Sequence, residues 1–239
     1  MTVLSNMSER IQWVIERLEK SYGRQTSYSR HDPMKQLILT ILSQRTTYAD
    51  ERKAFDQMIE RFGNWENIAF VPVEELTKAI APSNYPEIKA PRIQEVIKTI
   101  IAERGKPELD FLAELSTEEA VKWLRKLPGV GPKTTTFLLL FVFKRPVLPV
   151  DTHVYRVSQR VGLIGSKVTQ EKAHEVLLKM LPPIPDELLN FHKLLFKHGQ
   201  QVCTWNHLKC TQCVLKDICD FGRSVLKIET PMPVENTQE

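Results

Sequence analysis

Apolar residues along this chain recur at helical spacing, and the strict alternation typical of strands is nearly absent. The first stripe consists of Ile11, Val14, Ile15, Leu18 and Tyr22, and it predicts a helix that ends near Gly23. Further helices are predicted at 33–44, 48–62, 73–80, 91–104, 109–115, 117–127, 133–143, 152–161, 169–181 and 186–202. The pattern therefore predicts an all-α protein.

Length and composition are those of a globular chain. With 239 residues, 42% of them hydrophobic, the chain can bury a core in one large or two modest domains. No apolar run reaches the roughly 18 residues of a membrane-spanning helix, and the first residues lack the order of a secretion signal. We therefore expect an intracellular monomer without membrane contact, cytoplasmic or nucleoid-associated in a prokaryote. Residues 223–239, which include Pro231 and Pro233, are expected to form a flexible tail.

Residues 127–133 predict a tight hairpin between two helices. Gly129 and Gly131 flank Val130, so the backbone can turn sharply and approach a neighbour closely. Pro132 suits the first position of a new helix, whose unpaired backbone N–H groups can bind an anion. The same pattern also fits an ordinary helix–turn–helix corner.

Lys133 and Asp151 add candidate chemistry to this hairpin. Lys133 falls in the first turn of the second helix, where the helix dipole disfavours a cation and favours the neutral, nucleophilic amine. Asp151 follows an apolar extended run and begins the next helix. A simpler interpretation makes Asp151 an N-cap, and Lys133 a phosphate contact or a surface charge.

In combination, residues 127–134 and 150–153 resemble the helix–hairpin–helix and following acid of the endonuclease III family of DNA glycosylases. The spacing of Lys133 and Asp151 is similar to the family's, and the similarity extends from about Asp32 to Phe221. The resemblance implies that Lys133 forms an imine with the substrate and that Asp151 assists it. It also implies that the hairpin residues Gly129, Val130 and Gly131 bind DNA.

The family's layout implies two helical domains with an active-site cleft between them. A six-helix domain with the helix–hairpin–helix would span residues 33–145. Residues 1–32 and 146–222 would form the second domain, which carries an iron–sulfur cluster loop. Composition alone does not indicate this division.

Residues 43–47, at the end of the second predicted helix, resemble the family segment that fills the space left by an extruded base. The family's wedge glutamine aligns with Arg45, whereas Gln44 lies one position earlier. Either side chain could enter the duplex and offset the loss of stacking. Tyr48 stands where the family commonly has an acid, which implies a different substrate preference. A helix C-cap with a surface arginine is the simpler interpretation.

The four cysteines of the chain, Cys203, Cys210, Cys213 and Cys219, form a C-x6-C-x2-C-x5-C pattern. In an intracellular protein such spacing indicates a metal site rather than disulfides. The residues alone leave zinc and a 4Fe–4S cluster equally plausible. The resemblance favours the 4Fe–4S cluster, because the spacing is similar to the family's signature. Basic residues of this loop, Lys209 among them, are expected to contact DNA phosphates.

The function implied by the resemblance is base excision on double-stranded DNA that contains damaged bases or abasic sites. The expected enzyme is a glycosylase with AP-lyase activity that acts on oxidised pyrimidines. Two alternatives stay open: a monofunctional glycosylase of the same fold, or a non-catalytic iron–sulfur protein that binds DNA or senses redox state. The net charge of +4 permits nucleic-acid binding without demonstrating it.

Overall fold

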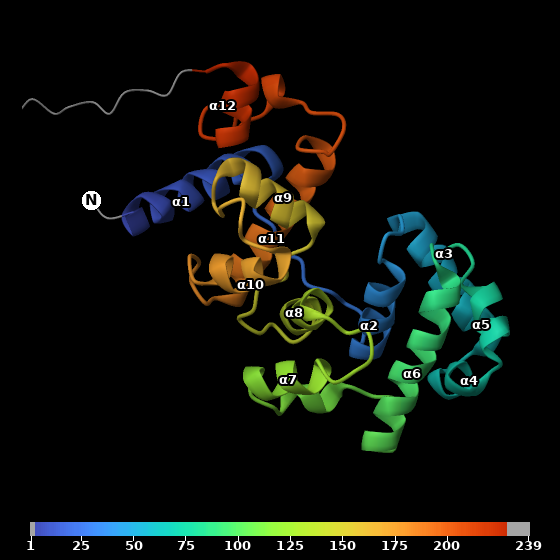
Figure 1. Cartoon of the computed structure of the whole chain (residues 1–239). Helices are drawn as coiled ribbons and strands as arrows, with labels where there is room; N and C mark the ends of the chain where they lie inside the picture. The colour runs from blue at the N-terminus through green and yellow to red at the C-terminus, as the bar shows by residue number, and fades with distance from the viewer. Residues whose placement is uncertain (1–2, 229–239) are drawn as a thin grey trace, which may run out of the picture. The chain divides into compact units, whose positions relative to one another are not determined.

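The computed structural model describes residues 3–228, and nearly all of its regular structure there is helical (Figure 1). Within residues 3–228, twelve α-helices and two short 3₁₀ helices are joined by turns and loops, and an isolated antiparallel bridge links Cys203 with Leu208. This confirms the all-α prediction. Within the described residues, no helix has both the length and the apolar character needed to cross a membrane.

The chain packs as two units. Ser27–Pro149 is continuous in sequence, whereas the other unit combines the described parts of Met1–Thr26 and Val150–Glu239. The continuous unit contains α2 (Pro33–Leu42), α3 (Tyr48–Phe62), α4 (Trp65–Phe70), α5 (Val73–Ala79), α6 (Pro86–Arg104), η1 (Asp110–Ala113), α7 (Thr117–Leu124) and α8 (Pro132–Phe141). The discontinuous unit contains α1 (Val3–Tyr22), α9 (Thr152–Val161), α10 (Gln170–Leu178), α11 (Pro185–Gln201), η2 (Cys210–Gln212) and α12 (Asp220–Leu226).

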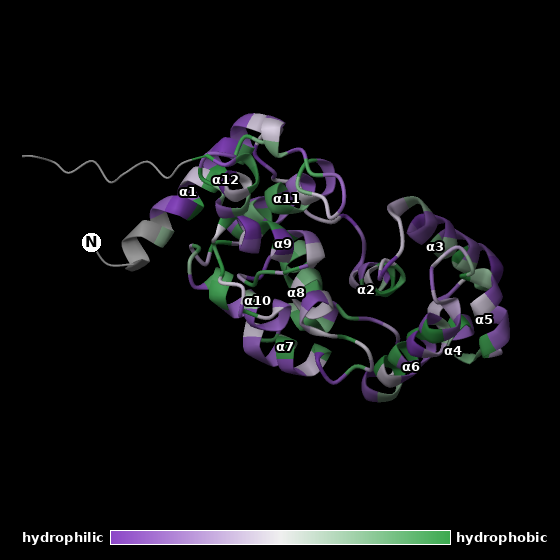
Figure 2. Ribbon diagram, turned by 45° about the horizontal axis from the view of Figure 1, so that its top comes forward, coloured by the Kyte–Doolittle hydropathy of each residue, from purple (hydrophilic) through white to green (hydrophobic). Residues whose placement is uncertain are grey.

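Each unit is organised around one buried helix or helix pair. In the continuous unit, α2 is buried around nearly its whole circumference and packs against α3, α6 and α8. In the discontinuous unit, α11 packs on α9 and α1, and Phe191 of α11 is fully buried. The same helices carry both polar and apolar residues, which Figure 2 shows in purple and green. An amphipathic helix of this kind can bury its apolar face and expose its polar face.

Several predicted helix boundaries were wrong. The helix expected from Pro91 begins at Pro86, and Pro91 lies inside α6 because the buried side of α6 holds the helix together across the missing hydrogen bond. The short α4 was missed, although Asn64 caps it through its side chain. The segment expected at 109–115 is a single 3₁₀ turn. The tail was expected from residue 223, yet α12 continues to Leu226; residues 229–239 lie outside the described part.

Candidate functional site

The hairpin between α7 and α8 forms where the sequence predicts it. Gly129 has φ of +72°, a conformation that residues with a Cβ rarely adopt. A Cβ built on Gly129 would lie 2.3 Å from Cδ of Arg92, so the arginine side chain lies directly on this glycine. Val130 is buried and its N–H donates to the carbonyl of Leu127 at 3.1 Å. The turn is therefore fixed both by backbone conformation and by close packing.

Gly131 has a different environment from Gly129. It is the N-cap of α8 in an extended conformation, φ of −86°, that any residue can adopt. A Cβ at this position would meet no atom within 4 Å. No side chain caps the first turn of α8, because Gly131 has none and Pro132 follows at the first helical position. The start of α8 is thus open to an approaching ligand.

Lys133 is the second residue of α8 and is half-buried. Its Nζ lies 5.4 Å from the centre of the Phe137 ring. Burial raises the pKa of the Glu51 carboxyl on α3, whereas the positive charges of Arg52, Lys133 and Lys89 lower it. Lys133 is therefore close enough to Glu51 for its charge to affect the ionisation of that carboxyl.

The loop that follows α2 presents Gln44 and Arg45 differently. Arg45 is exposed and has φ of +54°, and its guanidinium lies 5.9 Å from the centre of the Tyr85 ring. Gln44 is half-buried, and its Oε1 accepts a hydrogen bond from Arg92 Nη1 at 3.2 Å. Because Arg92 also lies on Gly129, the structure connects this loop with the hairpin inside one unit. Of the two candidate wedge residues, Arg45 is the one free to reach outward.

Asp151 belongs to the discontinuous unit and is the N-cap of α9. Its Oδ1 accepts hydrogen bonds from the backbone N–H groups of His153 and Val154, both at 2.8 Å. The simpler interpretation of Asp151 as a cap is therefore realised. A capping carboxylate still carries its charge, so the cap does not remove Asp151 from candidate chemistry.

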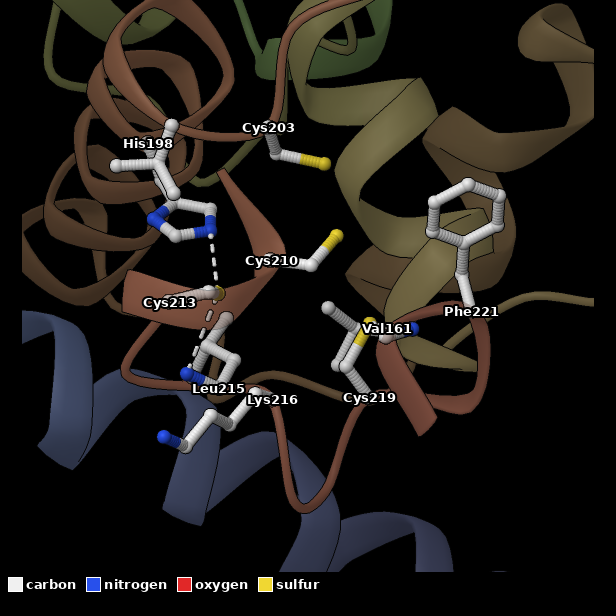
Figure 3. Close-up of a pocket in the computed structure, with 11 residues that line it drawn as sticks. Val161, His198, Cys203, Cys210, Cys213, Leu215, Lys216, Cys219 and Phe221 are labelled. Carbon is white, nitrogen blue, oxygen red and sulfur yellow. Dashed lines mark hydrogen bonds between the residues drawn. The ribbon is translucent and has the colours of Figure 1, made fainter. Parts of the chain in front are cut away.

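The four cysteines line one pocket, and Figure 3 shows their sulfur atoms around a common space. Cys203 follows the end of α11, Cys210 begins η2, Cys213 directly follows η2, and Cys219 caps α12. Val161 of α9 and Leu215 close the pocket with apolar side chains. Chain segments that are separate in sequence thus meet at the cysteines. The spacing read from the sequence reflects a real convergence.

Nitrogen donors point at three of the four sulfur atoms, the arrangement that proteins use around metal-bound thiolates. The backbone supplies two of these donors, and α9 supplies the third. The contacts are Arg160 Nη1 to Cys203 Sγ at 3.3 Å, Leu215 N to Cys213 Sγ at 3.4 Å and Gly222 N to Cys219 Sγ at 3.2 Å. Such donors stabilise negative charge on sulfur, so the site suits thiolates.

His198 connects the cysteine pocket to α1. Its Nδ1 lies 3.0 Å from the Tyr22 hydroxyl and its Nε2 lies 3.5 Å from Cys213 Sγ. Burial lowers the pKa of His198 to about 4, so the imidazole is neutral near pH 7. A neutral ring can accept from Tyr22 and donate to Cys213 at the same time.

Burial raises the pKa of the Cys210, Cys213 and Cys219 thiols, that of Cys219 to about 11. Thiols with such values keep their protons near pH 7 unless a metal displaces them. Within residues 3–228, no group of three or more His, Cys, Asp or Glu side chains could hold a single metal ion. Burial therefore favours the protonated thiol at these three cysteines.

The basic loop of residues 204–209 is held against α9. Arg160 Nη1 donates to the carbonyl of Thr204 at 2.7 Å, and Arg160 and Arg156 both lie against the exposed Trp205 ring. Lys209, at the end of this loop, is exposed.

Sequence reasoning missed two residues of these sites: Lys89 and Arg92. A signal existed for Lys89, which shares the spacing of Ile93 and Ile97 and therefore interrupts an apolar stripe with a charge. Arg92 carries no such signal, because its importance depends on Gly129, a neighbour distant in sequence.

Comparison with known proteins gives similarity over most of the chain. Residues 38–183 match the family model described as HhH-GPD superfamily base excision DNA repair protein. Endonuclease III of Thermotoga maritima is 35% identical over 197 residues, which cover 80% of this chain and 84% of that protein. Endonuclease III of Sulfolobus acidocaldarius is 29% identical over 187 residues, 77% of this chain and 80% of that protein.

Solved structures give the same result. The structure of a trapped Endonuclease III–DNA covalent intermediate, an estranged-adenine complex, has a TM-score of 0.79 at 25% identity. That similarity covers 95% of this chain and 100% of the other. A thermostable thymine-DNA glycosylase shares the fold, with a TM-score of 0.73 at 20% identity over 93% of this chain and 100% of that chain.

Proposed function

Because the chain belongs to the HhH-GPD superfamily of base excision DNA repair proteins and is a DNA glycosylase, we propose that it is bifunctional and removes oxidised pyrimidines. In this proposal Lys133 releases the base and then cleaves the strand. The observation that carries it is the position of a lysine at the start of α8, directly after the glycine hairpin. The similarity to a trapped covalent Endonuclease III–DNA intermediate supports a covalent route.

The chemistry begins with the neutral amine of Lys133, which attacks C1′ of the damaged nucleotide. The bond between C1′ and the base breaks, and the base leaves with the electron pair and takes up a proton. The nitrogen lone pair then forms the imine by breaking the C1′–O4′ bond, and O4′ takes up a proton as the sugar ring opens. The protonated imine acidifies C2′, so a base removes a proton there and the C3′–O bond breaks. The phosphate is the leaving group, and water hydrolyses the imine to regenerate the amine.

Asp151 is assigned two tasks in this reaction. Its carboxylate accepts the proton that Lys133 must lose before it attacks, and its charge stabilises positive charge that develops on the sugar. Capping of α9 holds the carboxylate in one orientation, which supports this assignment. The cap and the chemistry would then depend on the same side chain.

The hairpin and the loop after α2 are assigned to the DNA. Gly129, Val130 and Gly131 would hold a phosphate against the open start of α8, where no side chain occupies the first turn. Arg45, exposed next to Tyr85, would fill the space of the extruded base, with Gln44 as its support. Lys209 would contact the phosphate backbone from the cysteine loop.

The cysteine pocket fits a 4Fe–4S cluster held by Cys203, Cys210, Cys213 and Cys219. The convergence of the four cysteines on one pocket supports this assignment, and so do the hydrogen-bond donors to their sulfur atoms. When bound, the cluster would act as a rigid crosslink between the end of α11 and α12. The residues around it would then present Lys209 in a fixed loop.

Borohydride trapping tests this proposal, because hydride reduces the imine to a stable amine and leaves the protein attached to DNA. Duplexes with thymine glycol, dihydrouracil, 8-oxoguanine, uracil or an abasic site form the substrate panel. We expect adducts on the oxidised pyrimidines and on the abasic site, and none with Lys133→Ala. Lys126→Ala, which changes an exposed lysine directly before the hairpin, is the matched control and should trap normally.

The alternatives give different results in the same assay. Base release without an adduct would mean that water is the nucleophile, as in a monofunctional glycosylase. Binding to lesion duplexes without base release or adduct would favour a non-catalytic iron–sulfur protein. A normal adduct with Lys133→Ala would remove this lysine from the mechanism.

A further inference from the structure

A buried lysine lies beside the loop that carries Arg45. Only 3% of the Lys89 surface is exposed, and its Nζ lies among four neutral oxygen atoms. These acceptors are the carbonyls of Leu42 and Gln44, both at 2.7 Å, Thr46 Oγ1 at 2.9 Å and Ser83 Oγ at 2.7 Å. An ammonium has three N–H donors, so the four oxygens share them. The charge is therefore dispersed over the loop rather than paired with a carboxylate.

The positions of these acceptors give Lys89 a specific task. Leu42 is the last residue of α2, whose final carbonyls have no partner inside the helix. The ammonium satisfies one of them and lies at the negative end of the helix dipole. Gln44 and Thr46 are the two neighbours of Arg45 in sequence, so Lys89 holds the chain on both sides of the wedge candidate.

Arg45 needs such support because its backbone is strained. A φ of +54° at a residue with a Cβ is energetically unfavourable and persists only where the surroundings enforce it. The Arg45 carbonyl also accepts a hydrogen bond from the Asn84 side chain. Without the ammonium, the segment between α2 and α3 can relax to negative φ and turn the guanidinium elsewhere.

We propose that Lys89 is a positioning residue for base extrusion: its buried ammonium holds residues 43–46 in the conformation that presents Arg45 to the duplex. This inference rests on the proposed function of Arg45 as the wedge. It assigns a role in the extrusion step to a side chain that is sealed from solvent and cannot itself touch DNA in this conformation.

The test measures extrusion separately from chemistry. A duplex with 2-aminopurine beside a thymine glycol reports unstacking as a rise in fluorescence, and stopped flow gives its rate. Lys89→Met keeps the length of the side chain but removes the charge and the donors. We expect extrusion to slow by about tenfold to a hundredfold. Lys98→Met, at an exposed position of the same helix α6, should leave the rate unchanged.

Trapping on a duplex with a preformed abasic site gives the second readout, because such a site has no base to extrude. A selective loss of extrusion, with trapping largely retained, would support the proposal. Normal extrusion in folded Lys89→Met would overturn it. A parallel loss of melting temperature, extrusion and abasic-site trapping would also overturn it, since that is the result for a merely structural residue.

If Lys89→Met does not fold, Thr46→Val removes one acceptor and leaves the other three. For Thr46→Val we expect a smaller decrease in the extrusion rate than for loss of the ammonium. Lys89→Arg keeps a charged donor at this position, so it should keep part of the wild-type extrusion rate. Failure of the wild-type protein to form any adduct would defeat the proposed lysine chemistry. The fluorescence result would still decide the role of Lys89.

Discussion

The carboxylate of Asp151 has a structural partner and a proposed chemical one. Its Oδ1 receives two backbone N–H groups at the start of α9, so the side chain is both a cap and a fixed charge. Asparagine caps a helix about as well as aspartate does, whereas alanine does not. Substitution at this residue can therefore separate the two roles.

We expect Asp151→Asn to retain the stability of the wild-type protein but to lose most of its single-turnover base release. Asp151→Ala should lose the same activity and, in addition, about 1 kcal/mol of folding free energy. Thermal unfolding and single-turnover assays on both variants check this. Near-normal turnover of Asp151→Asn would leave the residue with the capping role alone.

The ammonium of Lys89 should give the rate of base extrusion an upper pH limit. Burial lowers its pKa from 10.5 to about 8, the charge of Glu51 opposes this, and that of Arg92 adds to it. As the pH rises through about 8, the ammonium loses a proton and one of its donors to the loop. Base extrusion should therefore decline above about pH 8 in the wild-type protein, and its residual rate in Lys89→Met should not vary with pH.

The effect of the same group on global stability has the opposite sign. Between about pH 8 and pH 10.5, the unfolded chain keeps a proton on Lys89 that the folded chain has released. Stability rises with pH wherever the unfolded state binds more protons. The contribution of Lys89 to folding should thus improve across the window in which extrusion declines. Fluorescence and denaturant unfolding at matched pH distinguish the two; a parallel decline would contradict the prediction.

The α7–α8 hairpin contains two glycines that should respond differently to the same substitution. Gly129→Ala places a Cβ on a backbone with φ of +72° and against Arg92, so we expect a loss of about 1–2 kcal/mol in stability. Arg92 must also move away, which disturbs its hydrogen bond to Gln44. Chemical denaturation checks the size of the loss.

Gly131→Ala is the matched control within this hairpin. Its backbone accepts alanine and no atom lies within 4 Å of the new Cβ, so the folded protein should be as stable as the wild type. The methyl group would nevertheless project where a phosphate is proposed to approach. We expect weaker binding to lesion duplexes in electrophoretic shift or anisotropy assays. Unchanged affinity would argue against a phosphate at the start of α8.

Elements were predictable where their signals are local in sequence. α3 and α9 begin and end as predicted, because Thr47 and Asp151 cap a clear amphipathic stripe and Gly63 and Gly162 end it. Pro91 misled the prediction for α6, since burial of Ile93, Ile97 and Ile100 outweighs one missing hydrogen bond. Tertiary packing therefore determines where α6 begins, and the periodicity of the sequence does not contain that information.

The candidate sites show the same distinction. The cysteine spacing and the glycine hairpin lie within short stretches, so the sequence indicated them directly. Arg92, by contrast, matters because it meets Gly129 and Gln44, and His198 matters because Tyr22 and Cys213 meet it. Contacts between distant positions become visible only in the folded chain.

At the scale of the whole molecule, we expect the cysteine pocket to hold residues 202–219 in one conformation. Residues 202–219 contain little regular structure beyond η2, and four side chains tie them together. We expect removal of iron by an oxidant and chelator to expose this segment to limited proteolysis within residues 204–218. Cleavage in the continuous unit, residues 27–149, should not change. Equal protection with and without iron would contradict the crosslinking role.

The order of the two units along the chain has a consequence for biosynthesis. Ser27–Pro149 is contiguous, so this unit can fold while the ribosome is still making the remainder. α1 leaves the ribosome before the continuous unit, but its packing partner α11 and its ion-pair partner Asp220 are made after that unit. Until α11 has been made, the apolar stripe of α1 therefore lacks the helix that covers it. Its burial and the filling of the cysteine pocket become late, coupled events, and a stalled nascent chain would present this helix to chaperones.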